Sequence, residues 1–98
     1  MKLAIVGSRS ITNYEKISEE IDIFIDEIPE VIISGGAKGV DSLAEKYAYE
    51  NNIEILIFKP DWKKFGKSAG VIRNKDIIQN STHVLAFWDG SSKGTLNL

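Results

Sequence analysis

The chain has 98 residues, of which 43% are hydrophobic and 27% charged, a composition typical of one globular domain rather than a disordered segment. It carries 12 basic and 14 acidic residues, so its net charge is −2, which disfavours a protein that binds long nucleic-acid duplexes through phosphate contacts. It contains no cysteine, which excludes disulfides, thiolate nucleophiles and cysteine-built zinc sites and fits a reducing compartment such as the cytoplasm.

Strand-like apolar runs alternate with helix-like segments along the sequence. In chain order, the predicted elements are a strand at residues 2–6, a helix reaching Ile28, a strand at 31–33, a helix at 40–51, a strand at 53–58, a helix from Lys67 or Ser68 to Gln79, and a strand at 84–88. Thr12 and Glu15 form a capping box that starts the first helix, and its apolar positions define one buried face: Ile17, Ile21, Phe24, Ile25 and Ile28. Residues 61–68 predict a loop, and Gly70 weakens the helix after it.

This alternation predicts an α/β fold with an open, Rossmann-like parallel sheet of four strands in the order 3-2-1-4 and three helices. In that order the loops after strands 1, 2 and 4 open at one edge of the sheet, where ligands usually bind. We expect residues 1–98 to form a single domain whose last helix, starting near Thr95, is cut short at Leu98. A face of the fourth strand then needs cover from a longer parent chain or from a second subunit, so we expect a homo-oligomer.

Two glycine-containing loops follow predicted strands, one with Gly35, Gly36 and Gly39 and one at residues 89–95. Glycines let backbone N–H groups approach a ligand closely, and a following helix directs its positive dipole end at the same place. The loops therefore predict sites for the phosphate of a nucleotide-like ligand. The alternative for the first loop is a tight turn that binds nothing.

Several side chains around these loops have two interpretations each. Ser34 either donates its hydroxyl to the ligand or satisfies the turn, and Asp41 either caps the helix or serves a ribose hydroxyl or catalysis. Arg9 either holds a phosphate or pairs with a surface acid, and the roles of Arg73 and Asn74 are ambiguous.

Other residues lead to weaker interpretations. Trp62 and Trp88 could each stack on a base, although packing is the favoured role. His83 has no Cys or His companion, so we expect it to be structural or solvated, and the sequence shows no recognisable metal site. Residues 66–68 read GKS like the end of a phosphate-binding P-loop, but the position five residues before Gly66 is not glycine.

Four sequence blocks together resemble the YspA-type, cpYpsA-related branch of the SLOG superfamily, which unites DNA-processing protein A with the LOG nucleotide-processing enzymes. The blocks are GSR at 7–9, SGGAKGVDSLAEKYA at 34–48, DWKKFGKSAGVIRNK at 61–75 and AFWDGSSKGT at 86–95. The resemblance implies a Rossmann-like fold that binds nucleotides or their derivatives. It carries a ligand-binding role onto Gly7, Ser8, Arg9, Ser34, Gly35, Gly36, Lys38, Gly39, Asp41, Arg73, Asn74, Asp89, Gly90, Ser92, Lys93, Gly94 and Thr95.

These observations favour a cytoplasmic module that binds or senses a small nucleotide-derived ligand, such as one related to NAD or ADP-ribose; no signal peptide or membrane span is evident. The first alternative is a LOG-like enzyme that cleaves a nucleotide N-glycosidic bond, with Asp41 or Glu45 acting on the ribosyl centre. The LOG motif PGGxGTxxE lacks its glutamate here, because the loops read SGGAKGVDS and GSSKGTLN. The second alternative is single-stranded DNA binding of the kind found in DNA-processing protein A, which the negative net charge disfavours.

Overall fold

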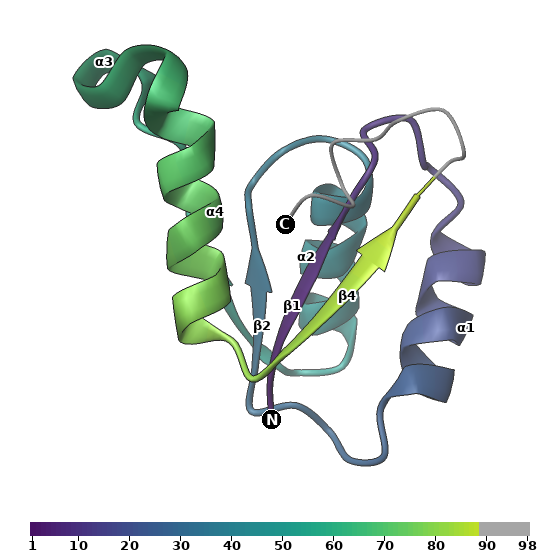
Figure 1. Cartoon of the computed structure of the whole chain (residues 1–98). Helices are drawn as coiled ribbons and strands as arrows, with labels where there is room; N and C mark the ends of the chain where they lie inside the picture. Colours follow the sequence, from purple (N-terminus) through teal and green to yellow (C-terminus); the bar gives the residue numbers. More distant parts are fainter. Residues whose placement is uncertain (89–98) are drawn as a thin grey trace.

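In the computed structural model, which describes residues 1–88, the chain folds into a central parallel sheet with helices on both of its faces (Figure 1). The sheet has four strands in the order β3-β2-β1-β4, so the predicted topology is confirmed. The strands are β1 (Lys2–Gly7), β2 (Val31–Ser34), β3 (Glu54–Ile57) and β4 (His83–Phe87). All three neighbouring pairs are parallel, so the carboxyl ends of the strands meet at one edge of the sheet.

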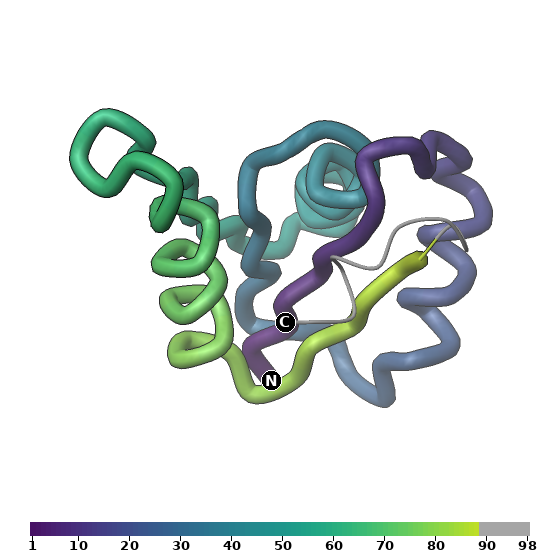
Figure 2. The backbone as a smooth tube through the Cα atoms, turned by 45° about the horizontal axis from the view of Figure 1, so that its top comes forward, coloured from purple at the N-terminus to yellow at the C-terminus, as the bar shows by residue number. Residues whose placement is uncertain are grey.

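The helices form two layers around the sheet, as the backbone trace in Figure 2 also shows. They are α1 (Tyr14–Phe24), α2 (Val40–Glu50), α3 (Trp62–Phe65), the 3-10 helix η1 (Gly66–Ser68) and α4 (Ala69–Asn80). The buried residues of α1 and α2 belong to one hydrophobic cluster, whereas Ile77 of α4 belongs to a second cluster. Helices α1 and α2 therefore cover one face of the sheet, and α4 lies on the other.

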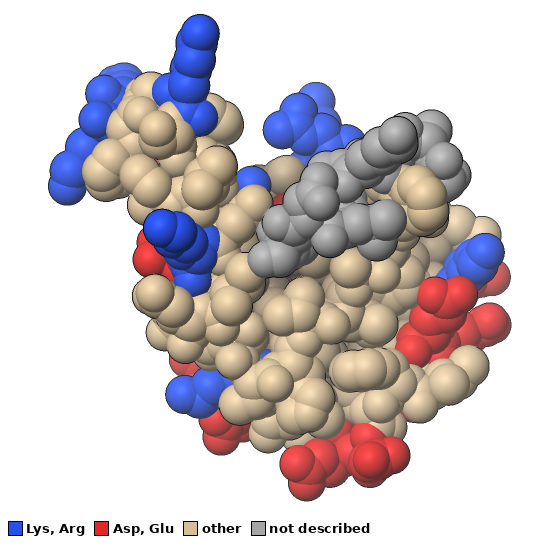
Figure 3. Space-filling model, in the orientation of Figure 1, with Lys and Arg blue, Asp and Glu red and all other residues tan. Residues whose placement is uncertain are grey.

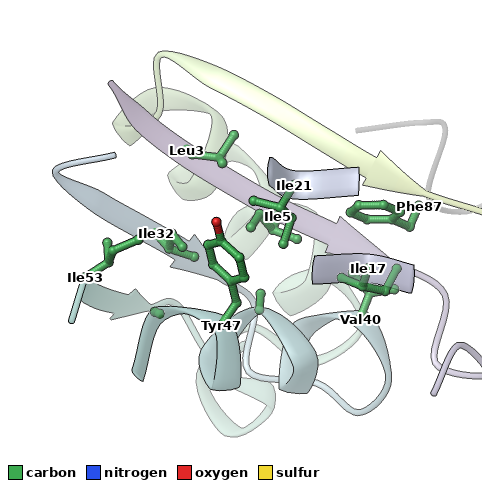
Figure 4. Packing of buried hydrophobic residues seen from close by; sticks show 11 residues of the cluster. Leu3, Ile5, Ile17, Ile21, Ile32, Val40, Tyr47, Ile53 and Phe87 are labelled. Atoms are coloured by element: carbon green, nitrogen blue, oxygen red, sulfur yellow. The ribbon is translucent and has the colours of Figure 1, made fainter. Parts of the chain in front are cut away.

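Strand β1 is at the centre of the fold because both of its faces are buried. Leu3 and Ile5 pack with α1 and α2 in the cluster drawn in Figure 4, whereas Ala4 and Val6 pack with Ile77 on the opposite face. All four β1 side chains are at most 6% exposed. A continuous apolar run, rather than alternation with polar residues, is what a parallel strand needs when helices cover both of its faces.

The face of the sheet that carries α4 remains partly open over β4. Val84 and Ala86 pair in register with Ala4 and Val6, so they point to the same face, and Val84 is 41% exposed. Neighbouring residues of a parallel pair share a face because side chains alternate in step along both strands. The expectation that a longer parent chain or a second subunit covers this face of the fourth strand stays a prediction. The truncated last helix predicted near Thr95 lies outside the described residues.

Helix α1 corrects two details of the sequence prediction. Its N-cap is Asn13, whose side-chain oxygen accepts the N–H of Lys16 at 3.2 Å, so the predicted capping role of Thr12 is wrong. The helix ends at Phe24 instead of reaching Ile28, which is 74% exposed. The apolar spacing continues beyond Phe24, but Pro29 disfavours helical backbone at the residue before it, and the chain must turn back to begin β2.

The segment at 61–68, predicted as a loop, instead forms α3 and η1. The Asp61 carboxylate caps α3 by accepting the N–H of Lys64 at 3.1 Å. The GKS sequence forms η1 and does not follow a strand, so it lacks the strand-loop-helix context of a P-loop. The other predicted elements agree with the structure to within one or two residues at each end.

No helix within residues 1–88 combines the length and the apolar character that crossing a lipid bilayer requires.

Candidate functional site

The loop at residues 35–39 joins β2 to α2 at the carboxyl edge of the sheet, beside the loop that follows β1. Gly36 and Gly39 both have φ of +71°, a backbone conformation that side chains with a Cβ rarely adopt. The N–H of Val40, the first residue of α2, donates to the carbonyl of Ser8 at 3.3 Å. The loops after β1 and β2 are therefore locked together at the start of α2, as the predicted topology required.

Each glycine of this loop leaves room for another part of the chain: a cationic side chain at Gly35 and Gly36, and the backbone of the β1–α1 loop at Gly39. A Cβ on Gly35 would lie 2.6 Å from Nη1 of Arg73, and a Cβ on Gly36 would lie 3.0 Å from Cγ of Lys59. A Cβ on Gly39 would lie 2.5 Å from Cα of Arg9. The three glycines thus bring residues from the β1–α1 loop, the β3–α3 loop and α4 into contact with one turn.

Arg73 has the best-defined position of these cations. Its Nη1 donates to the carbonyl of Gly35 at 2.7 Å, and its Nε donates to Oδ1 of Asn74 at 2.9 Å. The neighbouring Asn74 side chain therefore orients the guanidinium while α4 holds it against the loop. Of the two residues whose roles the sequence left ambiguous, Arg73 contacts the loop directly and Asn74 supports it.

Ser34 satisfies the turn, which was one of its two predicted roles. It is fully buried, and its hydroxyl accepts the N–H of Gly36 at 3.1 Å. The same oxygen lies 3.3 Å from both Oε2 of Glu45 and the carbonyl of Asp41, the two acceptors available to its single proton. These contacts hold Ser34, the last residue of β2, against α2.

Asp41 holds the loop from inside rather than capping the helix, because α2 has no side-chain cap hydrogen bond. Only 5% of the residue is exposed, and Oδ2 accepts the N–H of Ala37 at 3.1 Å. Burial raises the pKa of this carboxyl above its ordinary value, and Glu45 adds to the rise, whereas the Ala37 N–H, Arg73 and Arg9 oppose it. A desolvated carboxylate therefore lies between two arginines.

Replacing Asp41 with asparagine is expected to remove a stability term that depends on pH. Because the folded state raises the pKa of Asp41, ionisation of the carboxyl costs stability as pH rises through the folded pKa. Asp41→Asn keeps an acceptor for the Ala37 N–H, so its stability relative to wild type should grow as pH rises from about 3 to about 7. Urea unfolding across this range measures the difference.

Asp41→Ala is the matched control because it removes both the charge and the acceptor. It leaves the partly buried Ala37 N–H without its partner and should cost about 1 kcal/mol relative to the asparagine variant. Parallel pH profiles for wild type and Asp41→Asn would contradict the burial of an ionisable carboxylate at this position.

The remaining predicted site residues pack the fold, lie exposed at the loop surface or lie outside the described residues. Gly7 serves packing, since a Cβ there would lie 2.6 Å from both the Phe87 carbonyl and Cγ2 of Val40. Ser8 is buried and braces the start of α2 through its carbonyl, whereas Lys38 is exposed at the loop surface. The residues predicted for the second loop lie outside the described part of the chain: Asp89, Gly90, Ser92, Lys93, Gly94 and Thr95.

Lys59 is the site residue that the sequence analysis missed. Its side chain runs along Gly36, with Cε 3.3 Å from the place a Cβ would take. The signal was available, because Lys59 follows the third strand and the order 3-2-1-4 places that strand beside the second. No motif marks a single lysine before a proline, however, so only the topology could have identified it.

The two tryptophans and the histidine lie away from the closest contacts of the loop. Trp62 is 57% exposed and Trp88 46% exposed, so neither is a core residue. His83 is exposed, with its ring edge-on to Phe24 and Nδ1 2.9 Å from the Thr82 hydroxyl. Within residues 1–88, no cluster of three or more His, Cys, Asp or Glu side chains could hold a metal ion.

The arrangement leaves donors for an anion at the entrance to α2. Among residues 1–88, no acceptor contacts the N–H groups of Asp41 and Ser42 in the first turn of this helix. Lys59 and Arg73 supply positive charge beside the loop, and Arg9 is near enough to lower the pKa of Asp41. The acidic residues Asp41 and Glu45 offset part of this positive charge. Chemically, such a site can hold a phosphate or another small oxyanion.

Comparison with known proteins gives one family and one curated relative. The model of the YspA, cpYpsA-related SLOG family matches residues 1–65, a range that contains Arg9, the glycine loop and Lys59 but not Arg73. The gene 61 protein of Mycobacterium phage D29 is 37% identical over 71 residues, which cover 66% of this chain and 57% of that protein. The chain therefore spans little more than half the length of this relative. No solved structure matches the chain.

Proposed function

The chain belongs to the YspA, cpYpsA-related SLOG family, and from this premise we propose that it binds or senses a nucleotide-derived ligand at the loop of residues 34–41. Family membership supports a nucleotide-related ligand but does not identify it. We propose derivatives of NAD or ADP-ribose as the candidate ligands.

The observation that carries the proposal is the contact of the Arg73 and Lys59 side chains with one glycine turn, whose last glycine also lies against the backbone of Arg9. A turn that only reverses the chain has no need of cationic side chains drawn from two distant segments. Positive charge beside open N–H groups at a helix start matches what a phosphate requires. The phosphate of the ligand would therefore lie over the first turn of α2, between Arg9 and Arg73.

The two acids at the site favour binding over hydrolysis. The Asp41 carboxylate accepts the Ala37 N–H, and the Glu45 carboxylate contacts the buried Ser34 hydroxyl, so both hold the loop. Either acid can still accept a ribose hydroxyl through its second oxygen. Glycosidic cleavage would instead need a carboxylate free to act on the ribosyl carbon.

Isothermal titration calorimetry with a matched ligand series tests the proposal. We expect AMP, ADP, ADP-ribose or NAD to bind, and adenosine, which lacks phosphate, to bind at least about tenfold more weakly because it forgoes the charge-assisted contacts. Adenosine binding as tightly as AMP, or no binding by any member, would overturn the proposed site. Incubation with AMP followed by chromatography for free adenine tests the hydrolase alternative, and Asp41→Asn should abolish any release.

A further inference from the structure

Two parts of the molecular surface gather charge of opposite sign (Figure 3). Lysines gather over α3 and η1, whereas acidic side chains gather over α1 and the turn that follows it. We define the basic arm as Trp62, Lys63, Lys64, Phe65 and Lys67, and the acidic patch as Glu19, Glu20, Ile23, Asp26 and Glu27. Neither surface belongs to the candidate ligand site.

The basic arm combines positive charge with exposed aromatic rings. It projects from the end of α4 away from the sheet (Figure 1), and no residue of α3 or η1 is buried. Trp62 is 57% and Phe65 38% exposed, and Nζ of Lys64 lies 5.1 Å from the centre of the Phe65 ring. A Cβ on Gly70 would lie 3.8 Å from Cη2 of Trp62, so the indole rests against the first turn of α4. The arm therefore offers two large apolar side chains among three lysines.

The acidic patch has the opposite charge and its own exposed apolar residue. Glu19 and Glu20 lie four and three positions before Ile23, so the three side chains share one face of α1. Ile23 is 82% exposed, although isoleucine gains free energy when it is buried. Asp26 and Glu27 continue the acidic patch beyond the helix, and both are exposed. Oε1 of Glu27 lies 3.8 Å from the N-terminal ammonium group of Met1, which offsets part of its charge. The patch thus complements the arm both in charge and in apolar content.

We propose that the basic arm of one molecule docks onto the acidic patch of a second copy of this chain. Each surface combines exposed apolar groups with charge of one sign, and the two signs are opposite. The two surfaces can therefore bind each other when they belong to different copies of the chain. A nucleic acid is the weaker fit to the arm, because the chain as a whole carries a charge of −2 and the acidic patch repels a polyanion. Because the two surfaces differ, the contact is heterologous and builds closed rings or open chains of subunits.

Sedimentation velocity as a function of protein concentration tests this contact. We expect the wild-type chain to associate in low salt and to associate more weakly when the ionic strength is raised, because exposed charge pairs are screened. Lys63→Glu with Lys64→Glu should lower the association constant at least about tenfold, since two attractive contacts become repulsive. The control is Lys2→Glu with Lys75→Glu, which makes the same charge change at two exposed lysines outside both surfaces and should associate like wild type.

A charge-swap mixture makes the test specific. Glu19→Lys with Glu20→Lys should also prevent self-association, yet this variant mixed with the Lys63→Glu, Lys64→Glu variant should associate again, because each arm now meets a patch of opposite charge. Circular dichroism verifies that the variants fold. A wild-type chain that stays monomeric at all concentrations overturns the proposal, as does a mixture that fails to associate. Association only upon adding a single-stranded oligonucleotide, with quenching of tryptophan fluorescence, overturns it in favour of a nucleic-acid partner.

Discussion

Replacing Gly39 with alanine should lower the free energy of unfolding by about 2 to 6 kcal/mol, through two separate effects. The backbone at Gly39 has φ of +71° and ψ of −128°, and alanine in such a conformation costs about 1 to 3 kcal/mol. The added Cβ would also lie 2.4 Å from the Ser8 carbonyl oxygen and 2.5 Å from Cα of Arg9. These are backbone atoms that cannot rotate away, so the loops after β1 and β2 must separate, at about 1 to 3 kcal/mol more.

Gly66→Ala is a matched control for this prediction. Gly66 has φ of 55° and ψ of −132°, close to the values at Gly39, but a Cβ there meets no atom within 4 Å. Gly66→Ala should therefore lose only the conformational contribution, about 1 to 3 kcal/mol. Urea unfolding of both variants separates strain from collision, and equal losses would show that Gly39 is not a point of close contact between the two loops.

Gly39→Ala should also abolish nucleotide binding at temperatures where the variant remains folded. Separating the loops moves Arg9 away from the start of α2 and breaks the Val40 to Ser8 hydrogen bond. Titration of Gly66→Ala, whose substitution lies on the basic arm, should give the wild-type affinity.

The sheet order could be predicted because the strands are nearly continuous apolar runs. Such runs, separated by helices, leave few topologies open once right-handed crossovers are required. The end of α1 could not be predicted in the same way, because Phe24 and Ile28 supply the helical apolar spacing and yet lie exposed on the surface. Periodicity measures composition along a face and cannot tell whether another element covers that face.

The candidate site was predictable only as far as backbone chemistry determines it. The spacing of Gly35, Gly36 and Gly39 between a strand and a helix identified the turn, since glycine is needed where the backbone is tight. The contacts of Arg73 and Lys59 with that turn depend on how α4 and the β3–α3 loop pack in three dimensions, for which the sequence contains no local signal. The same applies to the Ala37 N–H, whose acceptor is the Asp41 side chain.

Arg73→Met should weaken nucleotide binding by about 10- to 100-fold while the protein stays folded. The substitution keeps an unbranched apolar side chain of similar reach but removes the guanidinium that donates to the Gly35 carbonyl and lowers the pKa of the Asp41 carboxyl. A charge-assisted contact with phosphate contributes about 1.5 to 3 kcal/mol, which corresponds to this range of affinity. Losing the cation also removes one of the influences that lower the pKa of Asp41. The neutral form of this carboxyl is then favoured, which offsets only part of the lost positive charge. Calorimetric titration with the tightest-binding nucleotide measures the loss.

Two further variants separate the role of Arg73 at the ligand from its role in the fold. Lys75→Met removes a cation two residues along the same helix, at an exposed position, and should leave affinity unchanged. Arg73→Lys keeps the charge but not the planar fork, so it should bind more weakly than wild type and more tightly than Arg73→Met. Adenosine, which carries no phosphate, should bind wild type and Arg73→Met alike. If Arg73→Met weakened adenosine as much as AMP, the arginine would act by holding the Gly35 turn in shape, and the phosphate would have to rest on Arg9 and Lys59.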